Sequence, residues 1–147
     1  MNNIDKLVDL EKKIQYKFQD FGLLEMAMRH SSYANEHHME RLECNERLEF
    51  LGDAILDAVV AHIVYKRFEG KREGFLTNTR SKIVQRETLN QIAVKIGLDK
   101  LIKYTTRHSS HNSYMCGNAF EALVGAIYLN RGNATCKFFM AERIIKP

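Results

Sequence analysis

The sequence predicts an all-helical protein that forms one domain. Its 147 residues, 45% of them hydrophobic, are enough for a single core, and we treat residues 1–147 as one domain. The only proline is Pro147, the last residue, so no proline interrupts a helix. Apolar residues recur every three or four positions along most of the chain, which is the spacing of helices with one buried face.

Two short helices are expected first. The apolar positions of the first are Ile4, Leu7, Leu10 and Ile14. Asp20 can cap the second, which continues to Met28. The polar residues 30–40 follow, and we expect them to form a loop.

The longest helix is expected in the middle of the chain. Asn45 is its predicted N-cap, and the segment 70–74, with two glycines, ends it. A further helix is predicted over residues 77–96, with Gly97 as its C-terminal stop. Gly52 costs the long helix roughly 1 kcal/mol relative to alanine, so we expect another backbone or a ligand to approach closely there.

The last part of the chain begins with an exposed polar loop, predicted over residues 105–113. Two more helices are expected, over residues 114–129 and 134–145, the second capped by Asn133. The prediction therefore consists of helices joined by loops, with no strand.

Composition narrows the class of protein without deciding its function. The formal net charge of +4 suits a polyanionic partner but occurs in many proteins without one. Cys44, Cys116 and Cys136 are odd in number and far apart, which fits a reducing compartment better than a disulfide framework or a zinc site. No export signal or bilayer-spanning stretch is visible, so the sequence predicts a soluble, cytoplasmic protein with no membrane partner.

Acidic residues gather at two places in the predicted helices. Glu46, Glu49 and Asp53 occupy positions i, i+3 and i+7, within about 60° of one another around the helix. Asn118 and Glu121 repeat the pattern in the apolar helix 114–129. If the two helices face each other, their carboxylates repel, and a hard cation such as Mg²⁺ or Mn²⁺ relieves that repulsion. This arrangement would make a metal-assisted phosphodiesterase site.

Each acid also has an ordinary structural explanation. Glu46 and Glu49 lie near a helix N-terminus, where the helix dipole favours negative charge. Asp53 and Glu121 lie deeper in apolar helices, where an arginine such as Arg80 could pair with either of them without any metal. Spacing alone leaves both interpretations open.

A family resemblance favours the metal site. Residues 45–54, NERLEFLGDA, resemble the signature stretch of the ribonuclease III family almost letter for letter. The resemblance extends to residues 30–33, 73–76 and 119–128, and so covers nearly the whole chain. It implies the ribonuclease III endonuclease-domain fold, a helical homodimer in which two active centres line one catalytic valley and each cuts one strand of double-stranded RNA. The products would carry 5′-phosphate and 3′-hydroxyl ends with two-nucleotide 3′ overhangs, as in the processing of ribosomal and messenger RNA.

The resemblance also implies roles for individual residues. The catalytic Mg²⁺, with Mn²⁺ as a substitute, would be bound by Glu49, Asp53, Asn118 and Glu121. Glu46 would be a further catalytic acid, and Glu73 an accessory acid in the same valley. Phe50 would insert into a pocket of the partner subunit, whereas without the resemblance it would be read as an ordinary core residue.

Basic residues beside the acids are candidates for binding RNA phosphates. We single out Arg80, Lys82 and Arg107, although any one of them could equally be a solvated surface charge. Double-stranded RNA is recognised mainly through its shape, phosphates and 2′-hydroxyls, so we expect little base specificity.

Two departures from the family pattern affect the prediction. Members usually carry aspartate where this sequence has Asn118. The sequence stops at Pro147, about where a linker to the usual double-stranded-RNA-binding domain would begin, so that domain is absent and we expect the catalytic part of a longer protein. The rival hypothesis is a non-catalytic RNA-binding or assembly module that kept the fold and is impaired at the metal site by Asn118. The four carboxylates that remain argue against it.

Overall fold

The computed structural model describes residues 3–105 and 114–131, and within these ranges all regular secondary structure is helical. The all-helical prediction is confirmed for this part of the chain. The predicted helix over residues 134–145 and the candidate RNA-binding residue Arg107 lie outside the described residues. The described part contains no helix long and apolar enough to cross a lipid bilayer.

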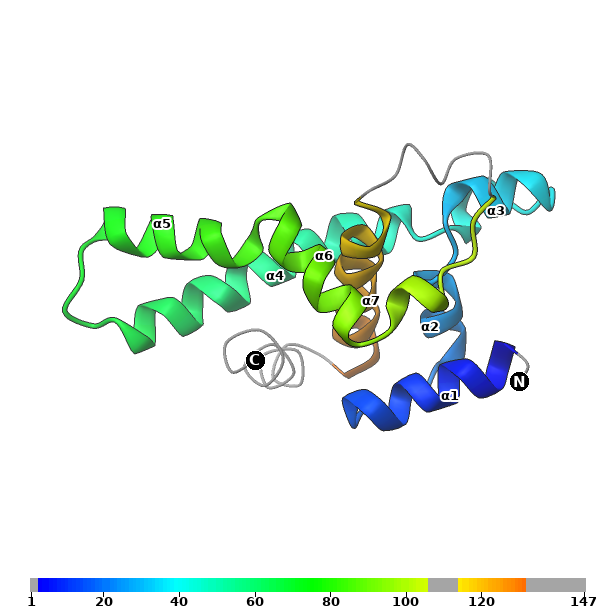
Figure 1. Ribbon diagram of the computed structural model, residues 1–147, viewed down its shortest axis with the longest axis horizontal. Coiled ribbons are helices and arrows are strands. Elements are labelled where there is room, and N and C mark those ends of the chain that lie inside the picture. The colour runs from blue at the N-terminus through cyan, green and yellow to red at the C-terminus, as the bar shows by residue number, and fades with distance from the viewer. Residues whose placement is uncertain (1–2, 106–113, 132–147) are drawn as a thin grey trace.

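Figure 1 shows the order and arrangement of the helices. The elements are α1 (Asn3–Ile14), α2 (Phe21–Ala27), α3 (Ser31–Glu36), the 3₁₀ turn η1 (Arg41–Glu43), α4 (Glu46–Arg67), α5 (Glu73–Val84), α6 (Arg86–Lys95), the 3₁₀ turn η2 (Leu98–Lys100) and α7 (Met115–Arg131). Helix α7 lies at the centre and packs against α4, α6 and α2. It is apolar on nearly every side because it is surrounded, and Phe120, Leu123 and Ile127 are fully buried.

The crossing of α4 and α7 is unusually close because each helix contributes a glycine. A Cβ atom at Gly52 would overlap the backbone carbonyl of Glu121, and one at Gly125 would overlap the carbonyl oxygen of Leu48. The predicted close approach of another backbone at Gly52 is therefore confirmed. The contact sets Asp53, the next residue of α4, beside Glu121 of α7.

The continuous helix predicted over residues 77–96 is wrong, because the chain forms two helices there. Gln85 has an extended backbone (φ −66°, ψ 154°) and separates α5 from α6. The hydroxyl of Thr88 donates a hydrogen bond to the carbonyl oxygen of Lys82 (3.1 Å) and so replaces a helical backbone bond. Helix α5 also begins earlier than predicted, at Glu73.

Three predicted helix ends have different outcomes. Asp20 caps α2 as expected, by accepting a hydrogen bond from the amide of Gly22 (3.1 Å), and Gly97 stops α6 with a left-handed φ of 90°. Asn45 precedes α4, but its buried side chain donates to the carbonyl of Ala27 (3.1 Å) and does not cap the helix.

The loop predicted over residues 30–40 is also partly wrong, since it contains α3. His30 accepts a hydrogen bond from the amide of Ser32 through Nδ1 (3.1 Å) and acts as the N-cap of this short helix. Histidine is a less common cap than serine or aspartate, so residue type alone does not predict a helix start here.

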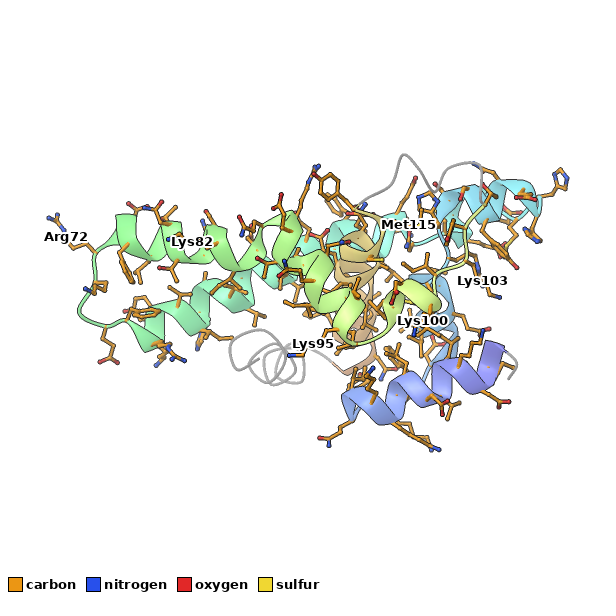
Figure 2. The ribbon with its side chains drawn as sticks, in the orientation of Figure 1. Arg72, Lys82, Lys95, Lys100, Lys103 and Met115 are labelled. Atoms are coloured by element: carbon orange, nitrogen blue, oxygen red, sulfur yellow. The ribbon has the colours of Figure 1, made fainter. Side chains whose placement is uncertain are left out.

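The C-terminal half of α4 and the antiparallel α5 form an arm that extends away from α7 (Figure 1). No residue of α5 is buried. The tip is held by an edge-to-face contact between the rings of Phe68 and Phe75, whose centroids lie 5.1 Å apart. Arg72 lies at the outer end of the arm and points away from the body of the protein (Figure 2).

Candidate active site

A pocket of about 600 Å³ opens where α4, the start of α6 and α7 meet. Its lining residues are Glu46, Glu49, Phe50, Asp53, Val84, Arg86, Leu89, Asn118 and Glu121. The two acidic groups predicted from spacing thus face each other across one cavity. The glycine crossing brings them together, because it allows the backbones of α4 and α7 to touch beside Asp53 and Glu121.

The carboxylates in this pocket are close enough to perturb one another. The pKa of Glu121 is raised to about 8, first by burial, then by a hydrogen bond to Asp53 and by the negative charges of Asp53 and Glu49. Arg86 opposes this rise. The hydrogen bond to Asp53 requires a proton on one of the two carboxyl groups, and it favours the protonated form of Glu121.

Glu49 shows the same effect. Its pKa is raised by burial and by the negative charges of Glu46 and Asp53, again with Arg86 acting in the opposite direction. The pocket consequently has an excess of negative charge that protons partly neutralise.

The pocket residues fit a hard divalent cation. Glu49, Asp53 and Glu121 offer carboxylate oxygens and Asn118 an amide oxygen, which are the donors that Mg²⁺ and Mn²⁺ prefer. Within residues 3–105 and 114–131, no three His, Cys, Asp or Glu side chains are already drawn around one point to hold an ion. With a cation held there, Glu121 would be ionised and the repulsion among the carboxylates would be relieved.

The other predicted site residues lie around or away from this pocket. Phe50 is 80% exposed at its rim and is therefore not a core residue. Arg80 and Lys82 lie on α5 and do not line the pocket.

Glu73 is at the first residue of α5, where it accepts a hydrogen bond from the hydroxyl of Thr77 (2.9 Å). At about 1.5 Å per residue, α4 runs about 20 Å beyond Asp53 before this arm turns back. Glu73 is thus outside the acidic pocket of its own chain, and its accessory role stays a prediction.

Sequence reasoning missed Arg86. The sequence suggests Arg80 as a partner for the acids, but Arg86 is the arginine that lines the pocket. Its positive charge partly offsets the rise in the pKa values of Glu49 and Glu121. The residue could not be found from spacing, because its position follows from the unpredicted break at Gln85.

The fold and the pocket define the chain as an all-helical domain with an oxygen-rich acidic site at a helix crossing. Residues 20–147 match the family described as ribonuclease-III-like. The chain belongs to the ribonuclease III family, as the sequence resemblance predicted.

Two curated relatives illustrate the similarity. Ribonuclease 3 of Phocaeicola vulgatus is 71% identical, over 92% of this chain and 44% of that protein. Ribonuclease 3 of Bacteroides thetaiotaomicron is 72% identical, over 98% of this chain and 50% of that protein. The chain thus spans about half the length of these relatives.

Solved structures agree with the fold. The nuclease domain of ribonuclease III from Campylobacter jejuni superposes with a TM-score of 0.84 at 33% identity, covering 99% of this chain and 96% of that one. Dicer from Pichia stipitis matches with a TM-score of 0.65 at 29% identity, over 89% of this chain and 56% of that one.

Proposed function

We propose that this chain is the catalytic part of a ribonuclease III, an endonuclease that cuts double-stranded RNA and uses Mg²⁺, with Mn²⁺ as a substitute. The observation that supports it most is the convergence of Glu46, Glu49, Asp53 and Glu121, with Asn118, in one pocket. The curated relatives that carry the name Ribonuclease 3 support the same activity.

The residues of the pocket would have different roles in such a reaction. Glu49, Asp53, Asn118 and Glu121 would hold the cation, which supplies an activated water and neutralises charge on the phosphate. Glu121 would release its proton to solvent when the cation binds, because the positive charge removes the cause of its raised pKa. Glu46, the first residue of α4, would be a further catalytic acid in the same pocket.

Cleavage of a long RNA duplex tests the proposal. Mg²⁺ should support cleavage, EDTA should abolish it, and single-stranded RNA of the same length should remain uncut. Mapping of the products should give 5′-phosphates, 3′-hydroxyls and two-nucleotide 3′ overhangs. A protein that binds the duplex but does not cut it at any Mg²⁺ or Mn²⁺ concentration would establish the rival, a non-catalytic RNA-binding or assembly module. We place the activity in the cytoplasm, in the processing of ribosomal and messenger RNA.

We further propose that the chain acts as a homodimer, with each subunit's pocket serving one strand of the duplex. The support on this chain is Phe50, a large apolar side chain left 80% exposed beside the pocket. The related nuclease domain of ribonuclease III from Campylobacter jejuni has a structurally flexible region involved in dimer formation. Light scattering should report twice 17.1 kDa at micromolar concentration.

Replacement of Phe50 should weaken this dimer. We expect Phe50→Ala to raise the dissociation constant at least about 100-fold, because a buried aromatic anchor contributes a few kcal/mol at an interface. Sedimentation equilibrium measures the change. Val94→Ala, at a 47% exposed position on α6, is the control and should leave the dimer intact. Equal dissociation constants for the two variants would remove Phe50 from the interface.

Asn118 should make the metal site weaker without disabling it. The amide oxygen still binds Mg²⁺, but the site lacks one negative charge, so we expect Asn118→Asp to lower the Mg²⁺ concentration for half-maximal cleavage about three- to tenfold. Asn78→Asp makes the same charge change on the exposed side of α5 and should not alter the requirement. If wild type is inert at every Mg²⁺ and Mn²⁺ concentration while Asn118→Asp cuts, the non-catalytic rival holds for the natural sequence.

A further inference from the structure

Among the described residues that line the acidic pocket, Arg86 is the one cation, and its neighbours there are four acids, three apolar residues and Asn118. Its charge reaches Glu49 and Glu121, yet no carboxylate oxygen of the described residues lies within 4.0 Å of its guanidinium. The side chain is exposed, and no hydrogen bond to another described residue occupies its N–H groups. As far as the described residues are concerned, its donors are open to a ligand that enters the pocket.

An aromatic ring holds this guanidinium in place. The Arg86 Cζ atom lies 4.9 Å from the centre of the Tyr114 ring. A guanidinium stacked on a ring keeps its edges free, and those edges carry the paired N–H donors that match phosphate oxygens. The contact favours this position of the charge without using the donors.

The backbone around Arg86 is equally well fixed. The break at Gln85 makes Arg86 the first residue of α6. Nearby, the amide of Gly117 on α7 donates to the side chain of Asn90 on α6 (3.2 Å), and the amide of Asn118 donates to the carbonyl of Tyr114 (3.0 Å). The arginine, its aromatic support and Asn118 thus belong to one anchored corner of the pocket.

Helix stability does not explain an arginine at this position. The N-terminus of a helix carries partial positive charge, so a cation in the first turn of α6 is unfavourable by a few tenths of a kcal/mol. A role in the pocket can offset this small cost. That role follows from the excess negative charge of the pocket. An RNA phosphodiester must approach four carboxylates, one divalent cation neutralises only part of their charge, and a further positive charge lowers the remaining repulsion.

We propose that Arg86 binds a phosphodiester group of the RNA strand that occupies the acidic pocket, with Tyr114 holding its guanidinium in the binding orientation. The inference rests on the proposed nuclease function and adds a phosphate-binding residue supplied by this chain. The other possible role is that of a counter-ion for Glu49 and Glu121, which the absence of a close ion pair among the described residues disfavours.

Single-turnover cleavage of duplex RNA by Arg86→Gln, Arg86→Lys and Lys95→Gln tests the inference. Lys95 is the matched control, because it is exposed on the same helix, carries the same charge and lies at the opposite end of α6 from the pocket (Figure 2). At saturating enzyme and Mg²⁺, we expect Arg86→Gln to cut at least tenfold more slowly and Lys95→Gln at the wild-type rate. Arg86→Lys should fall between them, since lysine keeps the charge but loses the paired donors.

Two binding measurements distinguish phosphate binding by Arg86 from a role as counter-ion for Glu49 and Glu121. With Ca²⁺ in place of Mg²⁺, duplex RNA should bind Arg86→Gln more weakly than Lys95→Gln. Mn²⁺ titration without RNA should show equal or tighter metal binding by Arg86→Gln, because a positive charge has been removed. The proposal would be overturned if excess Mg²⁺ restored cleavage by Arg86→Gln to the wild-type rate. It would also be overturned if Arg86→Gln cut as fast as Lys95→Gln. Inert wild type would instead overturn the nuclease function itself.

Discussion

Gly52→Ala is expected to unfold the protein or to lower its free energy of unfolding by more than about 3 kcal/mol. The added methyl group would overlap the backbone carbonyl of Glu121, and neither backbone can move without separating α4 from α7. Since these helices share the centre of the core, no flexible side chain can absorb the clash. Circular dichroism with thermal or urea unfolding measures the loss.

Gly74→Ala provides the matched control. A Cβ atom there meets nothing within 4 Å, and the residue is the second of α5, so the alanine should leave stability unchanged or raise it by up to about 0.5 kcal/mol. Gly125→Ala, facing the carbonyl oxygen of Leu48, should behave like Gly52→Ala. Wild-type stability of Gly52→Ala would contradict the crossing itself, and with it the geometry of the acidic pocket.

Glu121→Gln is expected to abolish most cleavage while leaving a folded and more stable protein. Loss of one anionic ligand should slow cleavage at least about 1,000-fold at saturating Mg²⁺, equivalent to about 4 kcal/mol of transition-state stabilisation. Asn118→Asp should have a far smaller effect, since it adds a charge to the cation's surroundings. Single-turnover rates of the two variants measure the contrast, and near-normal cleavage by Glu121→Gln would remove this residue from the site.

The stability of the same variant should depend on pH in a defined direction. The pKa of Glu121 is raised from 4.5 to about 8 in the folded protein, so between these values the folded chain binds more protons than the unfolded chain. Wild type should therefore lose stability as pH rises from about 4.5 to about 8 without divalent cations. Glutamine does not titrate, so this contribution disappears in the variant.

We expect Glu121→Gln to be about 1–2 kcal/mol more stable than wild type above pH 8, a difference that solvent screening at this half-exposed group keeps modest. Urea unfolding near pH 5 and pH 9 measures it. Added Mg²⁺ should narrow the gap at high pH by stabilising the ionised wild-type pocket. If Glu121→Gln were less stable than wild type at high pH, the ionised Glu121 carboxylate would not be destabilising the folded protein.

The sequence was informative where structure depends on local spacing. The acidic stripe of α4 and the close approach at Gly52 follow from helix geometry and from the cost of a glycine in a helix, and both were predicted. The break at Gln85 was missed because it depends on the hydroxyl of Thr88 bonding back to Lys82, and no glycine or proline marks the place. Arg86 was missed with it.

Two other outcomes depend on contacts between distant parts of the chain. Asn45 has the residue type of a helix cap, but the carbonyl of Ala27 competes for its side chain, and only the folded chain brings that group near. The position of Glu73 depends on how far α4 runs before the arm turns back, and its relation to an active centre depends on how subunits associate. The spacing of residues along one chain does not predict how two subunits associate.

The α4–α7 crossing also has a consequence for the protein during its own synthesis. Asp53 and Asn118 are 65 positions apart in the sequence, and the acidic pocket exists only once α7 has docked on α4. Helix α4, which carries the first group of acids, is synthesised and leaves the ribosome well before α7. A growing or partly unfolded chain therefore has acids but no assembled centre, and under the proposed function it would be inactive until folding is complete.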